Sequence, residues 1–244
     1  MNTRRPKAAT TLALLLAALL GGLAAEAQSL AVLPVNIFLA PGQMASSMTV
    51  SNQGTSGTAI QIRAYAWNQK GGDDQLIPSD NLVVSPPIAS IAPGATQVVR
   101  LILRHPAEDQ EATYRILIDQ IPPPAQPGVV HIVLRLSIPI FALPMTRAVP
   151  QVEFHMERDN GQLFLVGTNN GLRHASIRDI VLSTSDGREL KTERAASPYI
   201  LARTTRRWLI PVEGPLPGSN EPLRLTAHAD YGAIEEQVHV LTSQ

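Results

Sequence analysis

Short segments in which apolar and polar residues alternate recur along the chain, and no segment keeps a helical period for three turns. Successive side chains of a strand point to opposite faces, so this alternation is typical of strands with one buried face. Pro-Gly turns at 41–42, 93–94 and 127–128 separate the segments. The pattern predicts an all-β sandwich or barrel. The clearest strand segments are 29–43, 45–54, 59–68, 96–104 and 113–121.

After residue 144 the strand pattern starts again, which indicates a second unit. Two tight hairpins are predicted there, at the Asn-Gly of 160–161 and the Asp-Gly of 186–187, because both dipeptides suit the left-handed backbone of such turns. We predict two β-sandwich domains, residues 28–147 and 148–244. No Gly/Ser-rich linker separates them, which indicates a fixed angle between the domains.

One segment, VVHIVLRLSIPIFALP (Val129 to Pro144), is aliphatic on one face without interruption. Its opposite face carries Arg135 and Pro139, and a proline cannot donate to a strand ladder, so it belongs on an edge strand or at a bulge. A long apolar edge strand invites aggregation, so its presence requires a reason. Two explanations are open: the aliphatic face fills the core of its own domain, or it serves a partner. The aliphatic residues are Val130, Ile132, Leu134, Leu136, Ile138 and Ile140.

The first 27 residues have the features of a secretory signal peptide: a basic start, an apolar run at 11–20, and a small-x-small cleavage signal at 25–27. A retained membrane anchor is the alternative, although the run is short for a span.

Subtracting three basic residues and one acidic residue of this segment from 20 of each sign leaves 17 and 19, a net charge of −2. This near-neutral charge excludes a typical nucleic-acid binder. The chain has no second apolar run long enough to predict a membrane-embedded protein. The chain has no cysteine, so no disulfide framework stabilises it.

No constellation of residues in the sequence predicts catalysis, a metal site or a cofactor. None of the six histidines lies two to five residues from another, as metal ligands commonly do, and we interpret them as isolated surface or strand residues. No nucleophile elbow and no phosphate-binding glycine loop occurs. Carboxylates at 73, 74, 108, 109 and 111 lie in loop-like segments, and we interpret them as solvated turn residues. We therefore predict a protein that is not an enzyme and needs no cofactor.

Four segments together resemble the periplasmic pilus-assembly chaperones of the chaperone–usher pathway, and the resemblance covers the mature chain. The segments are SPPIASIAPGATQVVRLIL (85–103), YRILIDQIPPP (114–124), the opening strand (29–43) and ADYGA (229–233). These chaperones are two-domain, immunoglobulin-like, boomerang-shaped proteins that partner outer-membrane ushers. The Tyr-Arg at 114–115 resembles the pairing found in the branch of this family that handles spore-coat-U-like subunits.

The resemblance implies that 29–43 is a first strand that switches between sheets, that 113–121 is the sixth strand, and that 129–140 is the seventh. In the family the seventh strand lends its aliphatic face to a pilin subunit that lacks its own last strand, which is itself a known example of β-strand addition. Burying four such side chains gives about 6–12 kcal/mol gross, before the costs of association. The implied donor residues are Val130, Ile132, Leu134, Leu136 and Ile138.

The site that binds the subunit's terminal carboxylate departs from the family pattern. The family uses an Arg late in the first strand and a Lys near the end of the seventh, where this sequence has Asn36 and Pro139. A carboxylate favours a charge-assisted, bidentate partner. The nearest candidates are Arg115, at the start of the sixth strand, and Arg135, on the non-donor face of the seventh. For Arg115, an ordinary surface role is an equally open alternative.

The resemblance also implies an ion pair that fixes the angle between the domains. It joins Arg100, in VVRL, to Asp230, in ADYGA. The family completes this cluster with a Glu, where this sequence has Gln120 beside Asp119, so the cluster is reduced to one ion pair.

These observations predict a non-enzymatic periplasmic chaperone that captures pilin-like subunits and delivers them to an outer-membrane usher. The alternative is a structural or adhesive immunoglobulin-like surface protein whose seventh strand serves only its own core.

Overall fold

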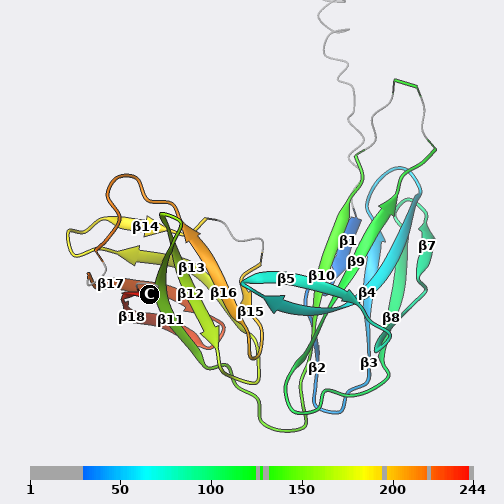
Figure 1. Cartoon of the computed structure of the whole chain (residues 1–244). Coiled ribbons are helices and arrows are strands. Elements are labelled where there is room, and N and C mark those ends of the chain that lie inside the picture. Colours follow the sequence, from blue (N-terminus) through cyan, green and yellow to red (C-terminus); the bar gives the residue numbers. More distant parts are fainter. Residues whose placement is uncertain (1–29, 125–126, 129–131, 194–196, 219–220, 242–244) are drawn as a thin grey trace, which may run out of the picture.

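The computed structural model describes residues 30–124, 127–128, 132–193, 197–218 and 221–241. All regular structure within these residues is β-strand, and the strands form two sandwiches (Figure 1). The prediction of an all-β protein with two sandwiches is confirmed. The predicted signal peptide lies outside the described residues, as does Val130 of the predicted donor strand.

The first sandwich contains two sheets that share one core. One sheet has the order β1-β3-β8-β6, and the other has the order β2-β10-β9-β4-β5, with β7 paired to β4. Val50, Ile60, Ile116 and Ile140 are fully buried between them. The strands are β1 (Leu30–Leu33), β2 (Ile37–Leu39), β3 (Ala45–Asn52), β4 (Thr58–Lys70), β5 (Asp73–Pro78), β6 (Leu82–Ser85), β7 (Ile88–Ile91), β8 (Thr96–Leu103), β9 (Ala112–Ile121) and β10 (Arg135–Ala142).

The chain changes sheets near its start, as the resemblance implied. β1 pairs antiparallel with β3, whereas β2 pairs parallel with β10. Pro34 lies between them and has no N–H with which to continue the ladder. The switch places β2 beside the last three residues of β10, Ile140 to Ala142.

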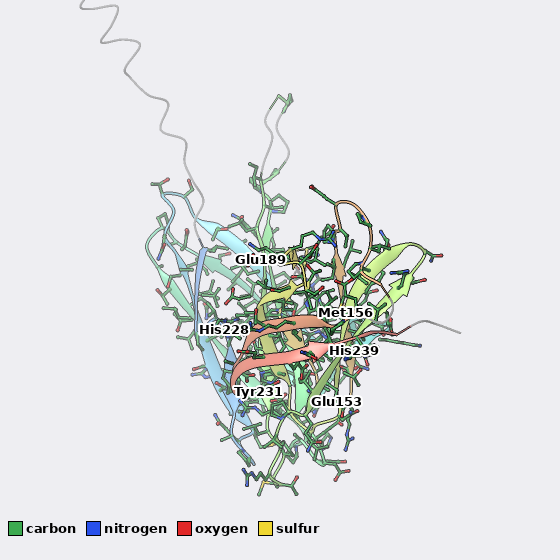
Figure 2. All side chains as sticks on the ribbon, turned by 90° about the vertical axis from the view of Figure 1, so that its left-hand side faces the viewer. Glu153, Met156, Glu189, His228, Tyr231 and His239 are labelled. Carbon is green, nitrogen blue, oxygen red and sulfur yellow. The ribbon has the colours of Figure 1, made fainter. Side chains whose placement is uncertain are left out.

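The second sandwich has sheets in the orders β16-β12-β11-β19 and β14-β13-β17-β18, with β15 paired to β13. Both predicted hairpins are present, with Asn160 and Gly161 between β11 and β12, and Gly187 between β13 and β14, all at positive φ. Tyr231 of ADYGA lies half-exposed in the turn between β17 and β18 (Figure 2). The strands are β11 (Val152–Asp159), β12 (Gln162–Asn169), β13 (Ala175–Ser183), β14 (Glu189–Lys191), β15 (Tyr199–Ile200), β16 (Thr205–Ile210), β17 (Leu223–Ala229), β18 (Gly232–Val238) and β19 (Val240–Leu241).

The sandwiches form the two arms of a bent molecule, joined at one end by the segment between β10 and β11 (Figure 1). The β4–β5 hairpin extends beyond its sheet and reaches the second domain, where Gly72 forms a β-bridge with Arg206. Close to the joint, Trp67 and Phe141 of the first domain are buried against Tyr199 and Leu201 of the second. Packing between the domains therefore adds to their covalent connection.

Candidate functional site

Strand β10 has one open edge over most of its length. Its other edge pairs antiparallel with β9 from Arg135 to Ala142. On the open side β2 covers only residues 140–142, so residues 135–139 have no strand beside them within the described part of the chain. Pro139 fits such an edge because it lacks an N–H to donate. The unpaired backbone groups could accept another strand.

The aliphatic face of this segment is divided between two environments. Ile138 and Ile140 are buried in the core of their own sandwich, and the half-buried Leu136 packs against that core. Ile132, in contrast, is 82% exposed, and it lies with the half-buried Leu134 outside any strand. Ile138, predicted as a donor residue, thus serves its own core here, because its parity faces the space between the two sheets. Each explanation drawn from the sequence describes one part of the segment.

Asp119 of β9 connects two arginines at the point where β10 begins. Its Oδ1 accepts a hydrogen bond from Nε of Arg135, and its Oδ2 accepts one from Nη2 of Arg63 on β4 at 2.6 Å. Burial raises the pKa of Asp119, but the hydrogen bonds and charges of the two arginines outweigh it and hold this pKa below its usual value. Arg135, predicted as an anchor for a subunit, therefore already has a carboxylate partner.

Arg115 lies on the face of its sheet that turns toward the second domain. Its guanidinium carbon lies 3.7 Å from the ring centre of Trp67 and 5.9 Å from that of Tyr199. Nη2 donates a hydrogen bond to Oγ of Ser197 at 3.2 Å. The pKa of Arg115 is lowered chiefly by burial, against the opposing charge of Asp74. With one hydrogen bond among the described residues, the guanidinium keeps donors for an anion.

Asn36 and Pro139 stand where the resemblance leads us to expect cations. Pro139 lies directly opposite Arg115 in the register between β10 and β9, so both side chains share one face. A cation on β9 thus stands beside the position on β10 where a cation is missing. Oδ1 of Asn36 lies 3.4 Å from the hydroxyl of Tyr199, and Asn36 lines a pocket of about 310 Å³ with Phe38 and residues of the second domain.

Residues 29–148 match the family model for the pili and flagellar-assembly chaperone, PapD N-terminal domain. The chain belongs to this family of pilus-assembly chaperones. Two curated relatives carry the name "Probable fimbrial chaperone EcpB". The protein of Escherichia coli O157:H7 (strain EC4115 / EHEC) is 29% identical and that of Klebsiella pneumoniae subsp. pneumoniae 28% identical over 207 residues, which is 79% of this chain and 88% of each relative.

Solved structures of pilus-assembly chaperones share the fold of two immunoglobulin-like domains. One is the CsuC–CsuE chaperone–tip adhesion subunit pre-assembly complex from archaic chaperone–usher Csu pili of Acinetobacter baumannii, with a TM-score of 0.65 at 20% identity over 88% of this chain and 100% of that chain. Another is the Salmonella enterica SafA pilin in complex with the SafB chaperone, with a TM-score of 0.59 at 15% identity over 88% and 97%. Within the described residues, no helix has the length and apolar character needed to span a membrane.

In this chaperone, the predicted ion pair between Arg100 and Asp230 is wrong. Arg100 lies on the exposed face of β8, in the sheet farther from the second domain (Figure 1). Asp230 stays within its own domain, where Oδ1 accepts the backbone N–H of Ser176 at 3.0 Å and Oδ2 lies 4.0 Å from Nη2 of Arg173. The contacts between the domains come instead from the other sheet of the first sandwich.

A buried pair, Glu111 and His174, crosses between the domains. Nδ1 of His174 lies 2.6 Å from Oε2 of Glu111, and the same oxygen accepts the backbone N–H of His174 at 2.8 Å. The two side chains are 0% and 2% exposed, and the imidazole stacks on Phe141 with the ring centres 3.7 Å apart. The interpretations of Glu111 as a solvated turn residue and of His174 as an isolated surface or strand residue are wrong. No sequence motif marks either residue.

The β4–β5 hairpin makes a second connection between the domains. The side chain of Gln69 donates to the carbonyl of Tyr199 at 2.8 Å and accepts the N–H of Leu201 at 3.0 Å. Nη1 of Arg206, whose side chain is 10% exposed, lies 2.9 Å from Oδ1 of Asp74. Asp74 is therefore an interdomain ion-pair partner, where the sequence indicated a solvated turn.

Proposed function

We propose that the chain is a periplasmic chaperone that captures pilin-like subunits by lending them β10 and the residues before it, and that it delivers them to an outer-membrane usher. The observation that carries this proposal is the open edge at residues 135–139 beside the exposed Ile132. A subunit that lacks a strand would pair with this edge and enclose Ile132 and Leu134 in its own groove. The predicted signal peptide at 1–27 would export the chain to the periplasm, where fimbrial chaperones act.

The named relatives support a chaperone over a surface adhesin. EcpB is named as a fimbrial chaperone, and the SafB chaperone was solved with a pilin. An adhesin in which β10 and the residues before it served only their own core would have no use for an 82% exposed Ile132. Fractionation separates the two functions, since a chaperone is recovered from the periplasm and an adhesin from the cell surface.

Arg115 is the residue that we propose to bind the subunit's terminal carboxylate. It faces the second domain beside Pro139, the stacking on Trp67 holds its planar group in place, and its free donors suit a bidentate carboxylate. Arg115, together with Asn36 and Pro139 in place of the usual cations, also supports assigning the chain to the branch that handles spore-coat-U-like subunits. Arg135 is less suited because Asp119 already occupies it.

The test is recovery of subunits with the tagged chaperone from periplasm, identified by mass spectrometry. Replacing Ile132 with Asn removes an aliphatic side chain worth about 1.5–3 kcal/mol when buried, so recovery should correspond to about ten- to hundredfold weaker binding. The matched control is Val133→Asn, which alters an exposed neighbour of opposite parity and should leave recovery unchanged. Equal recovery with both variants would contradict strand donation.

A further inference from the structure

The segment to be lent changes its character at Arg135. From Arg135 onward it pairs with β9, and Leu136 and Ile138 pack against the core. Residues 132–134, which come directly before Arg135, form no strand, and Leu134 is hydrogen-bonded to Gln120. The N–H of Gln120 donates to the carbonyl of Leu134 at 2.9 Å, and the N–H of Leu134 donates to Oε1 of Gln120 at 3.2 Å. This boundary separates a fixed part of the segment from a part available for capture.

Asp119 holds the boundary from the face opposite to the aliphatic residues. It stands directly across from Arg135 in the register of β9 and β10, and it also binds Arg63 of β4 on its other side. The carboxylate is only 17% exposed, whereas the side chains of Arg63 and Arg135 are 40% and 63% exposed. One ionised carboxylate therefore ties three adjacent strands together at the place where β10 begins.

We propose that Arg63, Asp119 and Arg135 form a clamp that fixes the register of the donor segment before a subunit arrives. A slip of one residue turns every side chain of a strand to the other face. Here such a slip would place Leu134 or Leu136 opposite Asp119, so the ion pair with Arg135 would be lost together with the core contacts. The clamp thus fixes the face of Leu136, and an extended continuation of β10 in a complex would place Leu134 and Ile132 on that same face. A strand already held in this way loses less conformational freedom on binding.

The first test uses the free chain and limited digestion with trypsin, which cleaves after arginine. Asp119→Asn keeps the shape of the side chain but removes its charge. Cleavage after Arg135 should then become about three- to tenfold faster, because proteolysis follows the population of the opened strand. Cleavage after the exposed Arg147, beyond β10, is the internal reference and should not change. An unchanged ratio of the two cleavage rates would overturn the clamp.

The second test measures capture and rests on the proposed function. The subunit recovered with the wild-type chain is unfolded in guanidinium chloride and diluted into each variant, and formation of the complex is followed over time. Asp119→Asn should slow capture several-fold, and Arg63→Gln, which leaves one of the two ion pairs, should slow it less. If Asp119→Asn fails to fold by circular dichroism, Arg63→Gln carries both tests. Faster cleavage with unchanged capture would overturn the role of the clamp in presenting the strand.

Failure of the proposed function would look different. In that case the wild-type chain would form no complex, or Ile132→Asn would capture subunits as fast as the wild type. The cleavage result on the free chain would stand in either case, because it involves no subunit.

Discussion

The two ends of the segment 132–142 lie in opposite environments. Phe141 is fully buried in the core shared by both domains, where it stacks on Phe38 and His174. Ile132, at the other end, is 82% exposed and outside any strand. An apolar edge strand slips or aggregates unless something restrains it. One end of a strand can therefore be offered to a partner when the other end is fixed in a core.

The largest difference between the two ends should appear in stability. Phe141→Ala removes a fully buried aromatic ring and should lower the free energy of unfolding by about 3–5 kcal/mol. Ile132→Ala, at the exposed end, should change it by less than about 0.5 kcal/mol. Urea unfolding of both variants measures the difference, and equal effects would show that the shared core does not hold the strand.

The buried pair beside Phe141 should contribute nearly as much. Glu111→Ala leaves the backbone N–H of His174 and its ring Nδ1 buried without their partner, so we expect a loss of about 3 kcal/mol. The exposed Glu108→Ala is the matched control, and it should remain within about 0.5 kcal/mol of the wild type. A loss for Glu111→Ala no larger than that of the control would contradict a stabilising role for the pair.

Arg115 lies between the two ends, on the face shared with Pro139, and its substitution should affect binding more than stability. Lysine keeps the charge but not the planar pair of donors, so Arg115→Lys should weaken subunit binding about tenfold. Recovery of the subunit from periplasm measures this effect. Arg100→Lys, on the exposed face of the other sheet, is the control; if it reduces recovery as much as Arg115→Lys, the anchor assignment fails.

The smallest effect should come from Asp119, next to the exposed end. Because its pKa is lower in the folded chain than in the unfolded chain, its contribution is fully present above the unfolded value of about 3.9 and is lost as the pH falls through the folded value. The stability difference between wild type and Asp119→Asn should therefore be about 1 kcal/mol at pH 7 and should vanish well below pH 4. Urea unfolding at pH 7, 5 and 3 measures it, and a difference that grew at low pH would contradict a stabilising role for the ionised carboxylate.

Alternation along the chain predicts most of the fold because it depends on neighbouring residues. The strands, the two hairpins of the second domain and the edge position of the strand with Pro139 all follow from local patterns. The same pattern could not show where the aliphatic face changes from core to surface. That change depends on where β2 and β9 end their pairing with β10, which involves residues distant in the sequence.

The contacts between the domains could not be predicted from local patterns. Glu111 and His174 are 63 residues apart, and Asp74 and Arg206 are 132 residues apart. Carboxylates in loop-like segments are usually solvated, and only the angle between the domains brings these two against buried partners. The ion pair of Arg100 with Asp230, expected from the resemblance, does not form because Arg100 lies in the sheet that faces away from the second domain.

The short parallel pairing of β2 with β10 limits how far a partner can insert. A strand that runs along the open edge passes residues 135–139 and then meets β2 beside Ile140. At about 3.3 Å per residue, those five positions give a track of about 17 Å. β2 therefore blocks insertion beyond Ile140, and a subunit strand that also reaches Leu134 and Ile132 has to extend in the opposite direction along the segment.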